Sequence, residues 1–188
     1  MSEMKMTPEE GQEFERTLPV EGLDQGVLYS ILDLGTQTSK YGDKRKLELS
    51  FELPNQKHEF KEGEGEKPLI VSEMYTMSFN TRSNLFKDIS TILGSTPGKD
   101  FDLFSLIGKT CNLNIGHNTR GKETFAVVKN IFKMGPDSPQ LTGEMPTKTL
   151  SLDPKEFDIE VFKSLPTWKQ DLIGKSPEFQ KAWAIANS

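Results

Sequence analysis

Residues 39–53 read SKYGDKRKLELSFEL, and this stretch indicates the fold of the whole chain. From position 47 to position 53 every odd-numbered residue is apolar and every even-numbered residue is polar. This period of two predicts a β-strand with one buried side and one solvent-facing side. The turn before the strand, Tyr41-Gly42-Asp43, lies among four basic residues: Lys40, Lys44, Arg45 and Lys46. A basic turn that carries an aromatic residue can bind a polyanion, but lysines are also common in exposed turns, where they discourage aggregation.

Four further segments are predicted to be strands from their apolar patterns and turn boundaries. They are residues 27–34, 69–79, 111–116 and 123–132. Before the fourth strand, apolar residues spaced by three and four predict a helix that Ser83 caps and Gly94 ends. Residues 54–68 are rich in Pro, Gly and charged residues and are predicted to form a mobile loop.

The predicted order, β-β-β-α-β-β within residues 26–134, is the connectivity of the OB-fold, a five-stranded Greek-key barrel. The predicted fold class is therefore mainly β with few helices. The expected core includes Leu47, Leu49, Phe51, Cys111, Leu113 and Ile115. In OB-folds the second and third strands, and the loops joining strands one to two and four to five, contact oligonucleotides or oligosaccharides.

This fold favours a nucleic-acid-binding role for the two basic hairpins. Basic side chains would contact phosphates, and aromatic side chains would stack on bases. The predicted nucleic-acid-binding residues are Lys40, Tyr41, Lys44, Arg45, Lys46, Tyr75, Phe79, Arg120, Lys122 and Phe125. Tyr41 is the strongest stacking candidate because it lies in a turn, whereas the aromatic residues of strands could equally face the core.

Two flanking segments complete the predicted domain organisation. Residues 1–25 form an acidic N-terminal arm, whose first 24 residues hold seven acids and two bases and so account for the net charge of −5 of the whole chain. The arm could compete with DNA for the basic hairpins, or could simply be solvated. Residues 135–188 are predicted to be an extended linker followed by short helices that pack on the barrel. Trp168, Phe179 and Trp183 are predicted to be packing anchors there.

Composition limits the class of protein. The 188 residues contain one cysteine, Cys111, which excludes a disulfide framework and fits a reducing cytosol, so a cytoplasmic location is expected. No apolar run reaches the ~18 residues of a membrane span, and the polar, acidic start of the chain does not fit a secretory signal.

The sequence also lacks the usual signatures of catalysis. Two histidines and one cysteine cannot assemble a zinc site of the usual ligand spacing. Two fragments of a phosphate-binding loop, residues 108–110 and 174–176, lack the first glycine of that motif. We therefore expect a protein that is not an enzyme and that needs no metal and no cofactor.

Several short motifs resemble those of a known family. They are residues 33–37 (DLGTQ), 75–78 (YTMS), 83–88 (SNLFKD), 106–113 (LIGKTCNL), 165–168 (LPTW) and 175–178 (KSPE). With these motifs the chain resembles the OB-fold single-stranded DNA-binding proteins of tailed bacteriophages. The resemblance implies that the protein binds and protects single-stranded DNA, largely without sequence preference, during phage DNA replication or recombination in the host cytoplasm. It also implies phage or host replication and recombination proteins as further partners.

One departure from that family leaves a second function open. Many of its members recruit replication enzymes through an acidic C-terminal tail, whereas this chain ends in WAIANS and is acidic at its start. An OB-fold module that binds a phage or host protein is therefore the alternative. The sequence leaves open whether the chain forms a homo-oligomer.

Overall fold

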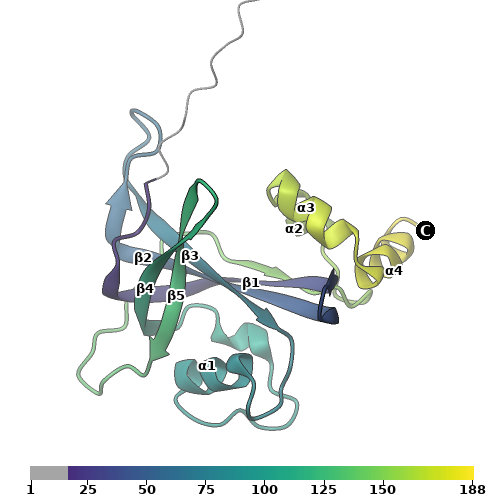
Figure 1. Cartoon of the computed structure of the whole chain (residues 1–188), viewed down its shortest axis with the longest axis horizontal. Coiled ribbons are helices and arrows are strands. Elements are labelled where there is room, and N and C mark those ends of the chain that lie inside the picture. Colours follow the sequence, from purple (N-terminus) through teal and green to yellow (C-terminus); the bar gives the residue numbers. More distant parts are fainter. Residues whose placement is uncertain (1–16) are drawn as a thin grey trace, which may run out of the picture.

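The structure is a computed structural model, and it describes residues 17–188 of the chain. It consists of a twisted β-sheet with helices at two of its ends (Figure 1). The elements are β1 (Gly22–Ser39), β2 (Gly42–His58), β3 (Lys67–Thr76), α1 (Asn84–Leu93), the short 3-10 helix η1 (Leu103–Leu106), β4 (Thr110–Arg120), β5 (Glu123–Phe132), β6 (Lys148–Leu150), α2 (Ile159–Lys163), α3 (Thr167–Gly174) and α4 (Pro177–Ala186). No helix in residues 17–188 is long and apolar enough to cross a membrane.

The sheet is antiparallel in the order β3-β2-β1-β4-β5, and the short strand β6 adds a parallel pairing to β1. The prediction of a mainly β chain with few helices is confirmed. The predicted closed barrel of five strands is not supported, because the described residues form six strands and no ladder joins β3 to β5. Beside this open edge, β5 carries a bulge between Val128 and Asn130, where its pairing with β4 shifts register.

The long hairpin of β1 and β2 is the centre of the sheet. The buried side of the predicted strand is confirmed, since Leu47, Leu49, Phe51 and Leu53 are all buried. The solvent-facing side is wrong at Glu48, Ser50 and Glu52, which are buried as well. The chain that follows β5 covers that face: Lys169 pairs with Glu48, and the backbone N–H groups of residues 144 and 145 donate to Glu52. β1 is longer than predicted because Gly35 does not end it. Gly35 has φ +70°, lies at a bulge in the pairing with β2, and lets the strand bend and continue to Ser39. A Cβ at this position would lie 2.2 Å from Ser176 Oγ, so only glycine fits against the C-terminal segment.

The boundaries of the predicted loop and arm are also corrected. β2 continues through residues 54–58, which pair in part with the start of β3, so the loop is confined to residues 59–66. β1 begins at Gly22, because residues 22–27 pair with β4. The acidic arm predicted for residues 1–25 therefore contributes its last residues to the sheet, and its residues 1–16 lie outside the described part of the chain.

The main core lies on one side of the sheet and is covered by α1. It contains all six residues predicted for it, together with Leu85, Ile89 and Ile92 of α1. The helix has the predicted ends: the Ser83 side chain accepts a hydrogen bond from Phe86 N at 3.1 Å, and Gly94 adopts φ +81°. This places α1 beside the open edge between β3 and β5 (Figure 1).

A second core joins the C-terminal segment to β1. Leu32 and Leu34 of β1 pack there with residues of β6, of the C-terminal helices and of the segments that join them: Leu150, Leu152, Phe162, Leu165 and Ile173. Phe179 and Trp183 pack against this cluster, as predicted. Trp168 does not, because its side chain is 58% exposed, so the prediction that it is a packing anchor is wrong.

Candidate nucleic-acid interface

A groove of about 730 Å³ runs along the open edge of the sheet, between β3, β5 and the N-terminal end of α1. Its lining contains five basic side chains: Lys44, Lys46, Arg82, Lys87 and Lys129. Two acidic side chains, Glu73 and Asp88, lie among them. We call this cavity the basic groove. Its excess of positive charge suits an anionic ligand.

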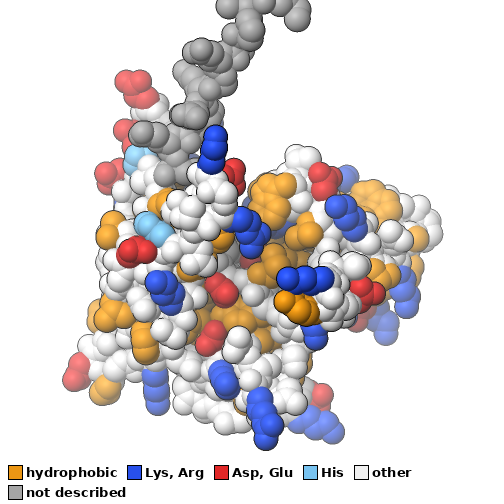
Figure 2. All heavy atoms as spheres, in the orientation of Figure 1, with side chains coloured by type: hydrophobic (Ala, Val, Ile, Leu, Met, Phe, Trp, Pro, Cys, Tyr) orange, Lys and Arg blue, Asp and Glu red, His pale blue; other side chains and the backbone are white. Residues whose placement is uncertain are grey.

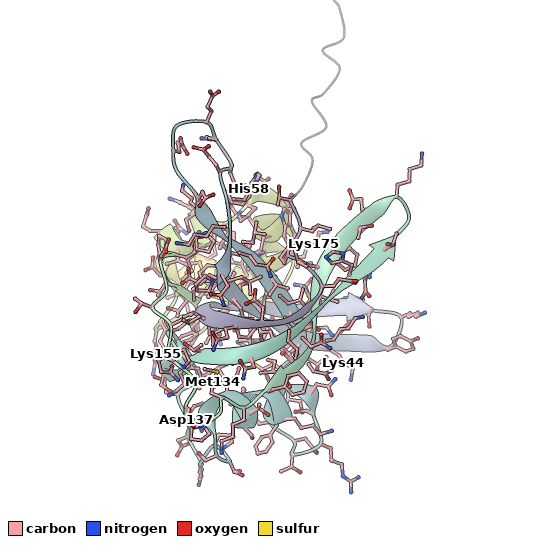
Figure 3. All side chains as sticks on the ribbon, turned by 90° about the vertical axis from the view of Figure 1, so that its left-hand side faces the viewer. Lys44, His58, Met134, Asp137, Lys155 and Lys175 are labelled. Carbon is pink, nitrogen blue, oxygen red and sulfur yellow. The ribbon has the colours of Figure 1, made fainter. Side chains whose placement is uncertain are left out.

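Lys44 and Lys46 reach the basic groove because of the same alternation that builds the core. Even-numbered residues of β2 lie on the sheet face opposite to Leu47 and its apolar partners. Lys46 lies opposite Thr76 of β3, and Lys46 Nζ donates a hydrogen bond to Thr76 Oγ1 at 2.9 Å. Lys44 is two residues closer to the turn and is exposed (Figure 3).

Arg45 lies on the other face of the hairpin and forms an ion pair with Asp33 of β1. Arg45 Nε donates to Asp33 Oδ1 at 3.2 Å, and this hydrogen bond raises the pKa of the guanidinium despite its partial burial. The structure therefore separates Arg45 from the two lysines that flank it in sequence, and gives the guanidinium an internal partner in place of a phosphate.

The turn of the β1–β2 hairpin presents Lys40 and Tyr41 to solvent. The Tyr41 side chain is 78% exposed, and Lys40 Nζ lies 5.0 Å from the centre of its ring. Such a cation–π contact leaves the second face of the ring free for a planar ligand. Tyr41 is thus placed as a stacking residue would be.

The other two aromatic candidates of this region lie elsewhere. Tyr75 is only 5% exposed and packs in the main core, and its hydroxyl donates to Asp88 Oδ2 at 2.8 Å. Burial, together with the nearby carboxylate, raises the pKa of that hydroxyl. Phe79 is exposed but follows the end of β3 and lines separate cavities near η1. Tyr75 is therefore a core residue, and Phe79 does not line the basic groove.

The β4–β5 hairpin carries the remaining predicted residues. Arg120 and Lys122 are exposed near its turn, and Arg120 Cζ lies 5.9 Å from the ring centre of the half-buried Phe125. These three residues do not line the basic groove. In Figure 3, however, the turns of the β1–β2 and β4–β5 hairpins extend to the same side of the molecule. Figure 2 shows Lys and Arg side chains over the β4–β5 hairpin, the region of α1 and the C-terminal helices, with apolar side chains between them.

Sequence reasoning missed three basic residues of the groove. Arg82 lies in the turn before α1, and Lys87 lies on α1 between its buried positions, so both could have been found by placing the predicted helix beside strand three. Lys129 lies at the β5 bulge and lines the groove there. No pattern in the sequence predicts this bulge.

The two acids of the basic groove have raised pKa values. For Glu73 the main cause is desolvation by burial, to which the neighbouring Asp88 adds. For Asp88 desolvation also dominates, although the hydrogen bond from Tyr75 and the charge of Lys87 act in the opposite direction. Both carboxyl groups therefore lose their protons at a higher pH than ordinary carboxyl groups do, so the negative charge in the basic groove rises with pH.

No group of three or more His, Cys, Asp or Glu side chains within residues 17–188 is arranged to hold a metal ion. No protein-family model matches the sequence, and no curated protein matches it.

Proposed function

We propose that the protein binds single-stranded DNA along the basic groove, largely without sequence preference, and is not an enzyme. The observation that carries this proposal is the gathering of five basic side chains from β2, β5 and the region of α1 along one open sheet edge. Phosphates would contact Lys44, Lys46 and the other bases of the groove. The exposed ring of Tyr41 would stack on a base beside it.

The topology supports this proposal. Three strands, a helix and two further strands follow one another in the chain, and β1 pairs with both β2 and β4. This is OB-fold connectivity, and we infer an OB-fold whose sheet is open between β3 and β5. In that fold β2, β3 and the two hairpin turns contact nucleic acid, and here the basic groove adjoins β2 and β3. The resemblance to phage single-stranded DNA-binding proteins extends the proposal to a role in phage DNA replication or recombination.

The test is a titration of a fluorescent oligo(dT) at a low and a high salt concentration. We expect binding at low salt and a steep loss of affinity at high salt, because bound phosphates displace condensed counterions. A Lys44→Glu variant should bind more weakly. The matched control is Lys155→Glu, since Lys155 is also exposed but lies on the side of the molecule away from Lys44 (Figure 3). Absence of binding at low salt would end the proposal.

An exposed apolar patch favours protein interaction as a second candidate function. Leu23 of β1 is 76% exposed and Phe132 of β5 is 45% exposed, and both line a cavity of about 540 Å³. Apolar side chains that share one exposed cavity are typical of a protein-binding surface. If a second copy of the chain occupies this patch, sedimentation will show concentration-dependent association that a Leu23→Asp, Phe132→Asp variant loses. A constant monomer mass would exclude self-association.

A further inference from the structure

Trp168 is an exposed indole at the start of α3. The side chain is 58% exposed, whereas the other tryptophan of the chain, Trp183, packs with Phe162 and Phe179 in the second core. A large exposed aromatic ring contributes little to the core and is available to a ligand.

A buried ion pair fixes the position of this indole on the sheet. The residue after it, Lys169, bonds to Glu48 of β2 with Nζ 2.6 Å from Oε1, and the two side chains are only 13% and 6% exposed. The same Nζ lies 5.1 Å from the ring centre of Trp168. The ammonium therefore contacts both the carboxylate and the indole, and links the ring to the even-numbered face of β2.

That face leads directly to the basic groove. Glu48 lies opposite Met74 of β3, and the next pair on the same face is Lys46 with Thr76. Met74 is 46% exposed, and together with Lys46 and Thr76 it lines the groove. The floor of the basic groove thus continues through Met74 to the residues that hold Trp168.

We propose that Trp168 is a base-stacking residue at one end of the basic groove, an inference that rests on the proposed function. A single strand whose phosphates contact Lys44 and Lys46 would cross Met74 and place a base on the exposed indole. Only an unpaired strand offers free base faces, because the bases of a duplex are stacked on one another. Trp168 would therefore contribute to the selection of single-stranded over double-stranded DNA.

The test compares the full-length protein with its Trp168→Ala and Trp168→Phe variants. Binding is measured with oligo(dT) and with a strand of the same length that carries abasic sites. Trp168→Ala should weaken oligo(dT) binding about 5- to 150-fold, the range found for the loss of one stacking contact. Trp168→Phe should retain most of the affinity. Neither variant should alter the affinity for the abasic strand, which has phosphates but no base to stack.

Tryptophan fluorescence gives an independent readout. Oligo(dT) should quench the emission of the unaltered protein, and Trp168→Phe should remove that response, because only the packed Trp183 remains. An unchanged affinity of Trp168→Ala, or an equal loss on the abasic strand, would overturn the role of Trp168 while the groove proposal stands. If the unaltered protein fails to bind oligo(dT) at all, both proposals fall.

Discussion

Arg45 and Asp33 pair across the β1–β2 hairpin on the face opposite to Lys44 and Lys46. Asp33 is buried, and besides Arg45 it accepts hydrogen bonds from Gly35 N at 3.0 Å and Leu152 N at 3.4 Å. The pair therefore joins the hairpin to the segment that follows β6. Arg45 is therefore part of the internal structure, although it lies in a run of basic residues.

Arg45→Ala should accordingly lower stability more than it lowers DNA affinity. It leaves the buried Asp33 carboxylate without its charged partner, at a cost of about 1–3 kcal/mol that the two remaining backbone donors reduce. Urea denaturation measures the first effect and oligo(dT) titration the second. Lys44→Ala is the matched variant and should show the opposite profile. A loss of affinity for Arg45→Ala as large as that for Lys44→Ala, with unchanged stability, would contradict this assignment.

Two tyrosines of the predicted interface should behave in opposite ways. Tyr41→Ala should weaken oligo(dT) binding by about 1–3 kcal/mol and leave the melting temperature unchanged, because its ring is exposed. Tyr75→Ala should destabilise the fold by about 3–5 kcal/mol, since it leaves a cavity in the main core. Thermal melting and titration of both variants check the pair. A Tyr75→Ala protein of normal stability would show that the ring is not a core residue.

The salt dependence of binding should show how many lysines of the groove contact phosphates. For single strands each phosphate contact contributes about 0.7 to the slope of log K against log salt concentration. The Lys44→Ala, Lys46→Ala double variant should therefore lower the magnitude of that slope by about 1.4. Titrations at four or more salt concentrations measure it, with Lys155→Ala as the control. A slope unchanged by the double variant would show that neither lysine contacts a phosphate.

Glu73 should make stability and binding depend on pH. Its folded-state pKa is raised, mainly by burial, so the folded state retains the proton over a pH range in which the unfolded chain has lost it. The stability that this proton confers is fully present below the ordinary glutamate pKa and is lost as the pH rises through the folded-state pKa. Glu73→Gln should therefore flatten the fall in stability with rising pH, as measured by urea denaturation at several pH values.

At a pH above the raised folded-state pKa of Glu73, the same variant should bind oligo(dT) several-fold more tightly, because one ionised carboxylate leaves the basic groove. The gain should shrink as the pH falls, since Glu73 itself becomes protonated. Glu66→Gln is a suitable control, because that exposed acid of the β2–β3 loop does not line the groove. Equal affinity of Glu73→Gln and the unaltered protein across the pH range would refute the effect.

Leu49→Asp should abolish cooperative unfolding. Leu49 is fully buried between Ile31 of β1 and Glu73 of β3 in the pairing of the sheet, and an unpaired charge there costs several kcal/mol, roughly. Leu23→Asp is the control, since that leucine is exposed on β1. An unchanged melting curve of the Leu49→Asp protein would show that β2 does not contribute Leu49 to the core.

The sequence predicts the parts of this structure that local patterns encode. The alternation at Leu47–Leu53 identified β2 and its apolar face, and the caps at Ser83 and Gly94 gave the limits of α1. The burial of Glu48, Ser50 and Glu52 on the other face of β2 could not be predicted, because it depends on residues that follow β5. β6 has three residues, too few to show a period, and its pairing with β1 is a tertiary event. The five-residue helix α2 is too short for a clear helical period, and its one local signal in the sequence is the N-cap Asp158.

The candidate site is harder to predict, because it depends on which face each side chain occupies. Arg45 and Lys44 are neighbours in sequence, yet the period of two places them on opposite faces, and only the position of Asp33 shows that Arg45 is paired. The exposure of Trp168 likewise depends on how α3 meets β2 through Lys169 and Glu48, which lie 121 residues apart. No local pattern carries that information.

The parallel pairing of β6 with β1 has a consequence for synthesis on the ribosome. β1 is translated well before the partners that follow β5, since Leu152 and Asp33 are separated by 119 residues. At cellular elongation rates of about 5–20 residues per second, that interval lasts roughly 6–24 s. During it the apolar face formed by Leu32 and Leu34 has no cover, so the nascent chain should be open to protease and to chaperones until β6 and the C-terminal helices emerge.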